Sequence, residues 1–465
     1  MSVGALTTSV FSGEERIAEK PFAQSVAHIA GAQYVTAGIG FLTSVVVARL
    51  LGPTDFGLAV LITSYPALLS SLLAVKSGSI TTRYISSFRA TQKKSELLST
   101  CKFGYAIDLL VALATLVLVA LSGWWVAGHF YHIAGSSWLM LGYAVSFPFW
   151  SLVGTSVAIV TSFQRFGCVA GLQILSKAIE CLVVISLLLM GFGVPGFVLG
   201  VAVSNILFGF IALTVATRTL RLENLGSCWG ASLSVVTPLR KELTGFFSWN
   251  YFAVTCSGLL ENLPLMLLGY VRGPADAGFY RLARSVVAPC SYLEVAMGKV
   301  AYPLLSSRSA TTRLHGLSAY LKRWTLVGGL PAGALVLVGI PILPLLIPVV
   351  FGGHYSPMVT GVQIMMVASA VSAIFFWLSS FYYASGKIAC WTMGCILQTV
   401  PVTGLAWFVI YQWGFVGMAT LATIGKVVFT LSMAVASKRV TGTRFANNTA
   451  SPLAGFKLTA KCSHE

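Results

Sequence analysis

Long apolar runs alternate with short polar segments along the whole chain. Each run is about twenty residues or longer, which is the length that a helix needs to cross a hydrocarbon core at about 1.5 Å per residue. Backbone polar groups in lipid must bond within their own segment, so we predict that every run is a membrane helix. The twelve predicted spans cover residues 27–50, 56–85, 99–122, 138–162, 168–190, 194–217, 245–271, 276–305, 323–350, 358–384, 388–411 and 414–437.

Sequence landmarks recur at a constant shift of 221 positions. The segment 52–57 reads Gly-Pro-Thr-Asp-Phe-Gly, and the segment 273–278 reads Gly-Pro-Ala-Asp-Ala-Gly. Gly193 and Gly414, each at the start of a late apolar run, obey the same shift. This internal repeat predicts an all-α, polytopic membrane protein with two six-helix lobes in the same membrane orientation. Parallel repeats occur in transporters, where the substrate binds between the halves.

The repeat and the polar segments together predict the domain boundaries. Lys and Arg gather in the loops on one side of the membrane, whereas the other side offers only Arg49 and Arg272. The positive-inside rule then places both termini in the cytoplasm. We predict a cytoplasmic N-terminal segment at 1–26, an N-terminal lobe at 27–217, a cytoplasmic linker at 218–244, a C-terminal lobe at 245–437 and a cytoplasmic tail at 438–465.

Composition excludes several classes of protein. Of the 465 residues, 56% are hydrophobic and only 9% are charged, which is too little charge to cover a soluble protein of this length. The net charge of +17 does not indicate nucleic-acid binding, because the basic residues lie in short loops where membrane topology explains them. The nine cysteines form no C-x-x-C pair, and we find no nucleophile–base set and no phosphate-binding glycine loop. We therefore expect no catalytic residue, no metal site and no ATP site.

The predicted span 276–305 carries the most informative charges. An ionisable side chain at mid-span costs about 2.5–3.5 kcal/mol on insertion scales, so such residues usually face a cavity or a partner. Arg281 and Lys299 share one helix meridian about 27 Å apart, and Arg284 lies one turn from Arg281. A bound anion relieves the repulsion between two close arginines, and guanidinium suits forked contacts with phosphate. These residues predict a cationic lining for a phosphate-bearing substrate, unless they simply pair with acids such as Glu261.

Glu261 lies three residues before Pro264 in the span 245–271. A proline in a helix frees a backbone carbonyl and bends the helix. A carboxylate at such a bend suits a gate, a proton relay or a cation site. The alternative is a simple ion pair with Arg284, and the sequence leaves both interpretations open.

Other charges within spans complete the set of candidates. Lys177 and Glu180 are three residues apart and can neutralise each other along one helix. Asp108 is expected at a similar depth, so Asp108 and Glu180 are either ion-coupling residues or members of a structural network inside the first lobe. Lys426 is alone in its span, and we include it with Arg49 in the candidate cationic lining.

Several motifs make the chain resemble a known family. The similarity spans nearly the whole membrane part, and its motifs are moderately specific for the superfamily. The resemblance is carried by the segments 48–57, 164–167, 261–280, 302–306 and 384–387. With these segments the chain is similar to bacterial polysaccharide flippases of the O-antigen and exopolysaccharide type, within the multidrug/oligosaccharidyl-lipid/polysaccharide exporter superfamily. Family members often have an aspartate in their seventh span, where this chain has Glu261.

The resemblance implies a fold and an activity. It implies two six-helix lobes around a central cavity, in a multi-pass protein of the bacterial inner membrane. It implies a flippase that moves undecaprenyl-pyrophosphate-linked oligosaccharide from the inner to the outer leaflet by alternating access, for lipopolysaccharide or exopolysaccharide biosynthesis. No cofactor is implied, and coupling to H⁺ or Na⁺ or to downstream polymerisation is expected. The candidate partners are a polysaccharide polymerase and chain-length proteins.

Two other functions remain open from the sequence. A cation-coupled multidrug exporter of the same superfamily would prefer a cavity dominated by acids and aromatic residues, because its substrates are cations. The other candidate is a non-transporting membrane scaffold for a glycan synthesis complex. The basic stripe of the span 276–305 favours the flippase.

Overall fold

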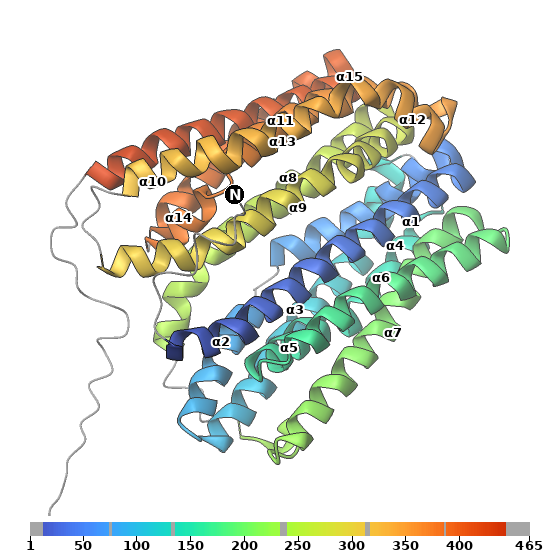
Figure 1. Cartoon of the computed structure of the whole chain (residues 1–465). Helices are drawn as coiled ribbons and strands as arrows, with labels where there is room; N and C mark the ends of the chain where they lie inside the picture. Colours follow the sequence, from blue (N-terminus) through green and yellow to red (C-terminus); the bar gives the residue numbers. More distant parts are fainter. Residues whose placement is uncertain are drawn as a thin grey trace, which may run out of the picture.

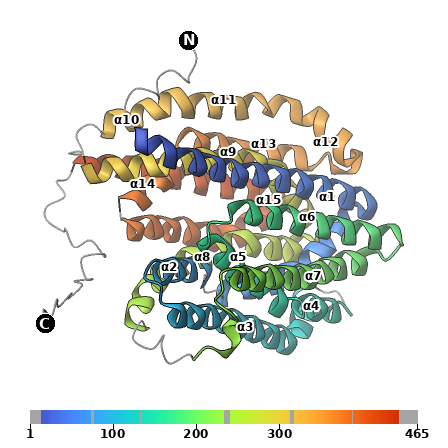
Figure 2. The same cartoon turned by 60° about the horizontal axis from the view of Figure 1, so that its bottom comes forward.

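The computed structural model describes residues 13–73, 77–131, 135–232, 240–311, 317–385 and 387–442. Within these ranges every regular element is a helix, and the long helices run side by side in one bundle (Figures 1 and 2). The first twelve residues and the predicted tail from residue 443 onward lie outside the described residues.

The first lobe is built by the elements up to α7. Its first helix, α1 (Gly13–Leu73), is 61 residues long and changes direction at Gly52, where φ is 75°. Glycine is the residue that takes this backbone conformation without strain, so the motif at 52–57 places the turn between the first two spans. The other elements are α2 (Ser77–Ala90), α3 (Lys94–Trp125), α4 (Ser137–Ala144), α5 (Phe147–Ser162), α6 (Phe166–Leu189) and α7 (Gly193–Leu222).

The second lobe repeats this plan. Its last helix, α15 (Ile388–Gly442), is 55 residues long and changes direction at Gly414, where φ is 56°. The other elements are α8 (Arg240–Arg272), α9 (Pro274–Thr311), α10 (Leu317–Trp324), α11 (Leu330–Val338), α12 (Leu343–Phe351), α13 (Met358–Ile374) and α14 (Leu378–Ala384).

The helices account for the twelve predicted spans. In the described part of the chain eight helices are long and apolar enough to cross a membrane, and the pair α13 and α14, bent by 44°, makes a ninth. Two of the eight are 43 and 49 residues long, about twice the length that one span needs, and the bends at Gly52 and Gly414 divide each into two. The less apolar α9 completes the set. The predicted all-α fold of about twelve membrane helices in two six-helix lobes is confirmed.

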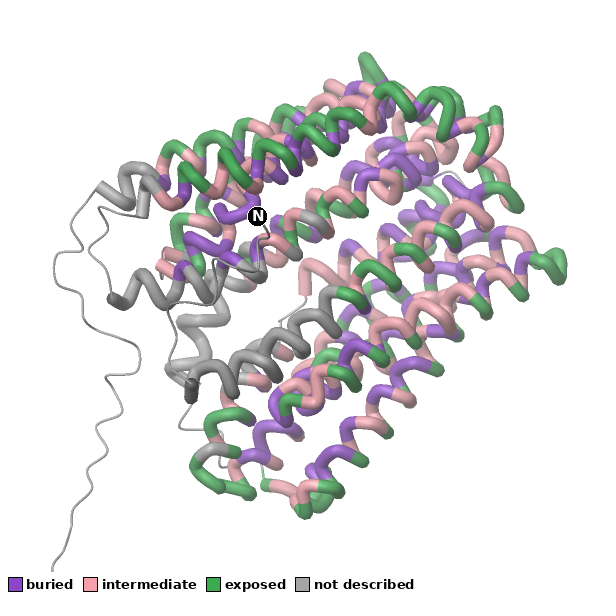
Figure 3. The backbone as a smooth tube through the Cα atoms, viewed as in Figure 1, coloured by how far each residue is buried: buried purple, intermediate pink, exposed green. Residues whose placement is uncertain are grey.

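Large apolar side chains cover the outside of the bundle. Leu110, Leu182 and Leu345 are 69%, 67% and 73% exposed. Figure 3 shows exposed positions along the outer sides of the helices and buried positions where helices meet. So much exposed apolar surface is unfavourable in water and favourable in lipid, so the chain is a multi-pass membrane protein.

The internal repeat is visible in the backbone. Gly52 and Gly273 both have positive φ, at 75° and 97°, and Gly193 and Gly414 have nearly equal values of 55° and 56°. Each pair is separated by the same 221 positions, so both lobes turn at the same places.

The two copies of the repeated motif pack against each other. A Cβ atom at Gly57 would lie 1.8 Å from the carbonyl oxygen of Pro274, and one at Gly278 would lie 3.0 Å from that of Pro53. The absence of a side chain at these glycines therefore allows the backbones of the two lobes to touch. We call this end of the bundle the Gly52 end.

Further contacts join the lobes at the Gly52 end. The Arg49 side chain donates to the carbonyl oxygens of Val349 and Val350, which end α12. The Tyr355 hydroxyl donates to the carbonyl oxygen of Ala48 over 2.8 Å. Phe41 of α1 also packs edge to face on Phe351, with ring centroids 5.9 Å apart.

The boundary of the predicted linker differs from the helix ends. Helix α7 continues to Leu222, beyond the predicted lobe end at 217, because apolar residues such as the fully buried Leu220 extend its packed face. A short 3-10 turn at Cys228–Gly230 then packs on α3, where Trp229 stacks on Tyr105 at 5.6 Å. The beginning of the predicted linker is thus attached to the first lobe.

Candidate functional site

A cavity of about 450 Å³ lies between the two lobes. Both halves of α1, together with α4, α6 and α7, form the wall of the first lobe, and α8 and α9 form the wall of the second. Its polar lining residues are Thr36, Thr43, Ser44, Thr63, Ser64, Tyr143, Lys177, Glu180, Glu261, Asn262, Arg281, Arg284, Ser285 and Tyr292. The cavity therefore has the position that a parallel repeat predicts for a substrate site.

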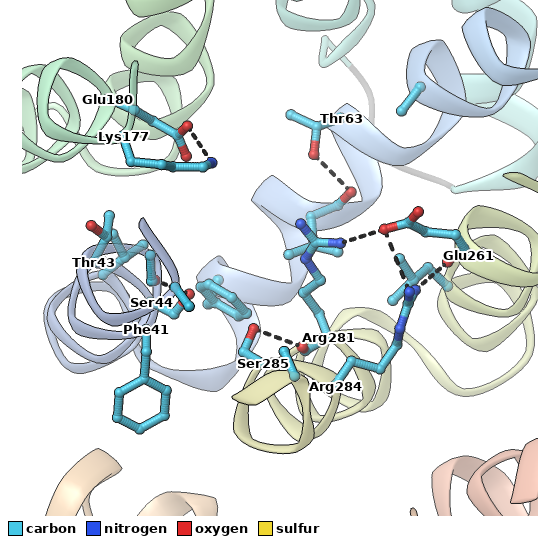
Figure 4. Close-up of a pocket in the computed structure, with 18 of the residues that line it drawn as sticks. Phe41, Thr43, Ser44, Thr63, Lys177, Glu180, Glu261, Arg281, Arg284 and Ser285 are labelled. Carbon is cyan, nitrogen blue, oxygen red and sulfur yellow. Dashed lines mark hydrogen bonds and ion pairs between the residues drawn. The ribbon is translucent and has the colours of Figure 1, made fainter. Parts of the chain in front are cut away.

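Two arginines and one glutamate form the charged wall of the second lobe. Arg281 Nη1 lies 3.7 Å and Arg284 Nη2 lies 3.4 Å from the same oxygen, Glu261 Oε1. Arg284 Nη1 also donates to the backbone carbonyl oxygen of Glu261 over 2.9 Å. Figure 4 shows both guanidinium groups approaching the Glu261 carboxylate. The ion pair of Glu261 with Arg284, one of the two interpretations that the sequence leaves open, is present, and Arg281 shares the same carboxylate.

The chain brings these three side chains together through the turn at Gly273. Helices α8 and α9 run in opposite directions from this turn, and Glu261 precedes it by 12 positions while Arg284 follows it by 11. At about 1.5 Å per residue both residues lie about 17 Å from the turn. Arg281 lies one helical turn from Arg284 on the same side of α9, so both guanidiniums reach one carboxylate.

The wall of the first lobe carries a neutral ion pair. Lys177 Nζ and Glu180 Oε2 on α6 are 2.6 Å apart, and both residues line the cavity opposite the arginines (Figure 4). The ion pair along one helix that the sequence allows for these two residues is present. The structure places the pair at the lining of the inter-lobe cavity.

Hydroxyl groups of α1 occupy the rest of this wall. Thr43, Ser44 and Thr63 each donate to a carbonyl oxygen of their own helix, over 2.8, 2.9 and 3.0 Å. Their oxygen lone pairs remain available to accept hydrogen bonds from a bound molecule. In the described part of the chain the buried Thr36 Oγ1 has no hydrogen-bond partner, although Thr36 is a lining residue.

The charge of the cavity is positive and lies on one wall. Arg281, Arg284 and Lys177 contribute three positive charges, and Glu261 and Glu180 contribute two negative charges. The Lys177–Glu180 pair is neutral by itself, so the excess of one positive charge belongs to the α9 wall. This wall favours anions, whereas the opposite wall offers hydrogen-bonding groups.

Two other candidate cations lie away from the cavity. Arg49 is not among the lining residues: it extends to the Gly52 end, where the α12 carbonyls face it. Lys426 of α15 is not among them either, and its Nζ lies 5.9 Å from the centre of the Phe429 ring within the second lobe. Both side chains face other parts of the fold in this structure, and their assignment to the cationic lining remains a prediction.

The remaining candidates have different positions. Lys299 belongs to α9, and its side chain lies outside the described residues. Asp108 of α3 accepts a hydrogen bond from the Thr155 hydroxyl over 2.7 Å, between α3 and α5, and is not among the lining residues. The roles assigned to Glu261, Glu180, Arg281 and Arg284 in binding or coupling remain predictions.

Sequence reasoning missed the hydroxyl stripe of α1. The lining residues Thr36, Gly40, Thr43, Ser44 and Val47 follow helical spacing of three or four positions. Polar and small residues in this order indicate one face of a membrane helix that avoids lipid. This periodic signal is present in the span 27–50, but none of its residues is charged, and the candidates chosen from the sequence were charged residues.

Comparison with known proteins identifies the family. The model of the polysaccharide biosynthesis protein family matches residues 22–309. The inner membrane protein YghQ of Escherichia coli (strain K12) is 24% identical over 339 residues, covering 71% of this chain and 92% of that protein.

Solved structures share the fold at low sequence identity. An inward-facing multidrug resistance MATE family transporter of the MOP superfamily has a TM-score of 0.70 at 11% identity, with 88% of this chain and 94% of that chain covered. The lipid II flippase MurJ in an inward closed conformation also has a TM-score of 0.70, at 14% identity, with 88% and 87% covered. An outward-facing MATE family transporter has a TM-score of 0.62 at 11% identity, with 90% and 95% covered. With the fold of this superfamily and a family match over more than half of its length, the chain belongs to the polysaccharide biosynthesis protein family.

Proposed function

We propose that this protein is a flippase of the bacterial inner membrane. Its substrate would be a polyprenyl-pyrophosphate-linked oligosaccharide, which it moves from the inner to the outer leaflet by alternating access. The observation that carries the proposal is the pair of guanidiniums, Arg281 and Arg284, on the wall of the inter-lobe cavity. The product would supply the synthesis of a surface or exported polysaccharide, and the glycan is left unspecified.

The chemistry of the α9 wall supports a phosphorylated headgroup. A pyrophosphate diester carries two negative charges and several acceptor oxygens, and guanidinium binds such oxygens in a forked geometry. Arg281 and Arg284 lie one turn apart and are 45% and 33% exposed to the cavity, so a ligand can reach both. Transfer of such a headgroup through lipid is costly, and a water-filled chamber with fixed cations lowers that cost.

The opposite wall supports a sugar next to the phosphate. Sugar hydroxyls are donors and acceptors at once, and the hydroxyls of Thr43, Ser44 and Thr63 together with the Lys177–Glu180 pair offer both. The apolar polyprenyl chain would remain in the bilayer beside the lobes.

The contacts between the lobes support an alternating-access cycle. Those at the Gly52 end, which the distribution of Lys and Arg predicts to be the periplasmic side, include the contact between the two repeated motifs. Others lie toward the opposite end, where the Tyr251 hydroxyl donates to the carbonyl oxygen of Leu72. We infer that this state is closed to the periplasm and that separation of the two repeated motifs opens it. Rocking of one repeat against the other is the usual motion of such transporters.

The charge of the cavity weighs against a multidrug exporter. Organic cations would meet an excess of one positive charge on the α9 wall. The fold alone is compatible with either function, and the charged lining supports the flippase.

The test is a complementation experiment with a double arginine variant. In a strain that lacks this protein, Arg281→Ala with Arg284→Ala should leave the protein in the membrane and abolish its polysaccharide product. We expect a loss of at least about tenfold, because each charge-assisted bond to phosphate is worth about 1.5–3 kcal/mol.

A matched control makes the same Arg→Ala substitution outside the cavity. Arg165 pairs with Glu223 at 3.0 Å outside the cavity, and Arg165→Ala should retain most of the product. Normal polysaccharide from a well-inserted double variant would contradict the proposal.

A further inference from the structure

The Glu261 carboxylate lies where an anionic ligand of the two arginines would bind. Its Oε1 atom is 3.7 Å from Arg281 Nη1 and 3.4 Å from Arg284 Nη2. Charge-assisted hydrogen bonds between such groups are about 2.7–2.9 Å long, so this carboxylate neutralises the guanidiniums without a tight bond to either side chain. The Glu261 side chain is also 49% exposed, so it has space to leave.

The second ion pair of the cavity, Lys177–Glu180, has a tighter geometry. Lys177 and Glu180 are 2.6 Å apart, which is a full hydrogen bond, and no second cation is bonded to that carboxylate in the described part of the chain. Both cavity carboxylates carry the same charge, but only Glu261 is shared loosely between two cations. Glu180 is therefore the matched control position for substitutions of Glu261.

We propose that Glu261 is an internal substitute for the substrate's phosphate, which occupies the arginine site while the flippase is empty and is displaced when substrate binds. The inference rests on the proposed flippase function and assigns to Glu261 the threshold for anion binding at the arginine site. Displacement imposes the same penalty on every anionic ligand, because each must first replace the carboxylate.

The penalty sets a threshold for binding. A lipid with one phosphodiester brings one negative charge, as much as the carboxylate that it replaces, and gains little from the exchange. A pyrophosphate diester brings two charges and gains the attraction of the second. Glu261 would thus keep the arginines free of bulk phospholipid, which is far more abundant in the bilayer than the substrate, and would favour release of the product by returning to the site.

The experiment measures binding to the purified full-length protein in detergent. The probes are a short-chain prenyl-pyrophosphate-linked N-acetylglucosamine, with two charges, and dihexanoyl phosphatidylglycerol, with one charge. For Glu261→Gln we expect both probes to bind about tenfold or more tightly, by similar factors. The interaction energy of two unit charges about 4 Å apart, even when partly screened, is larger than the free energy of a tenfold change in affinity. Glu180→Gln adds the same charge to the cavity and should shift both affinities by a clearly smaller factor.

Three outcomes overturn the inference. Unchanged or weaker binding to Glu261→Gln would show that the carboxylate orients the arginines and does not compete for them. Equal effects of Glu180→Gln and Glu261→Gln would show a general charge effect. A much larger gain for the pyrophosphate probe than for phosphatidylglycerol would show repulsion from a carboxylate that stays in place.

Failure of the proposed function has a separate signature. If Arg281→Ala with Arg284→Ala binds the pyrophosphate probe as tightly as the unmodified protein, the arginine site itself is wrong, whatever Glu261 does. Should Glu261→Gln not yield a monodisperse protein, Glu261→Asp replaces it. The shorter side chain keeps the charge but reaches less far toward the arginines, so it should tighten both probes by an intermediate factor.

Discussion

Arginines at two helix ends show how residues of one type serve different roles in this fold. Arg49 donates to the carbonyls of Val349 and Val350 across the lobe interface, with 2.7 Å between its Nε and the Val350 oxygen. Arg272 donates to the carbonyls of Ile410, Tyr411 and Gln412 inside the second lobe, over 3.1–3.2 Å. Both stabilise helix C-termini, whose carbonyls are otherwise unpaired.

This contrast predicts different consequences for two matched substitutions. Arg49→Ala should weaken the contact between the lobes by about 1 kcal/mol after allowance for solvent screening, which shifts the open–closed equilibrium at the Gly52 end about fivefold. Arg272→Ala removes the same group within one lobe and should leave that equilibrium nearly unchanged. Distance distributions between spin labels on the two lobes measure the shift, and equal distributions for Arg49→Ala and the unmodified protein would refute it.

Charge identity and helical depth were enough to predict part of the site from sequence. Counting residues from the Gly273 turn places Glu261 and Arg284 at similar depths, because both distances along the helix are set by the chain itself. Their ion pair was therefore one of the two interpretations that the sequence left open. The same reasoning could not place Arg49, Lys426 or Lys177, since which side of a helix faces a cavity depends on how the helices pack. The hydroxyl stripe of α1 has a periodic signal in the sequence, but its residues are uncharged and charge was the basis on which candidates were selected.

At the scale of elements, glycines determine where the two lobes turn and touch. The positive φ angles at Gly52, Gly273, Gly193 and Gly414 fix the turns, and the repeat in the sequence predicted that they correspond. The backbone contact between Gly57 and Pro274 was not predictable from the repeat, because it joins one copy of the motif to the other in space.

The two motif glycines predict graded effects of a single added methyl group. A Cβ at Gly57 would lie 1.8 Å from a backbone oxygen of Pro274, which cannot rotate away, so Gly57→Ala must separate the lobes at the Gly52 end. A Cβ at Gly278 would lie 3.0 Å from the Pro53 oxygen, so Gly278→Ala should have a smaller effect in the same direction.

Accessibility of the cavity measures these effects. Thr43 lines the cavity and is only 8% exposed, so a cysteine at this position should be labelled slowly in the closed state. Thr43→Cys in a cysteine-free background therefore reports entry of a membrane-impermeant maleimide from the periplasm. Labelling should rise severalfold with Gly57→Ala and less with Gly278→Ala. Labelling that stays at the background level with Gly57→Ala would show that this contact does not hold the lobes together.

At the scale of the whole molecule, one arrangement connects the repeat to the function. The duplicated lobes enclose a cavity whose α9 wall carries the excess positive charge and whose α1 wall carries hydroxyls. Hydropathy and the repeat predicted the two lobes, since lipid restricts the fold to helices and a duplicated chain restricts their order. The cavity arises only when the lobes pack against each other, and its lining therefore required the structure.

Transport by the purified protein in vesicles tests the central claim most directly. The measurement follows the movement of a fluorescent polyprenyl-pyrophosphate-linked sugar between leaflets of vesicles that contain either the unmodified protein or the variant with Arg281→Ala and Arg284→Ala. The account predicts that the unmodified protein moves the lipid well above the rate of protein-free vesicles and that the variant falls to that background. Movement by the variant at the unmodified rate, or none by the unmodified protein under an imposed H⁺ or Na⁺ gradient, would contradict it.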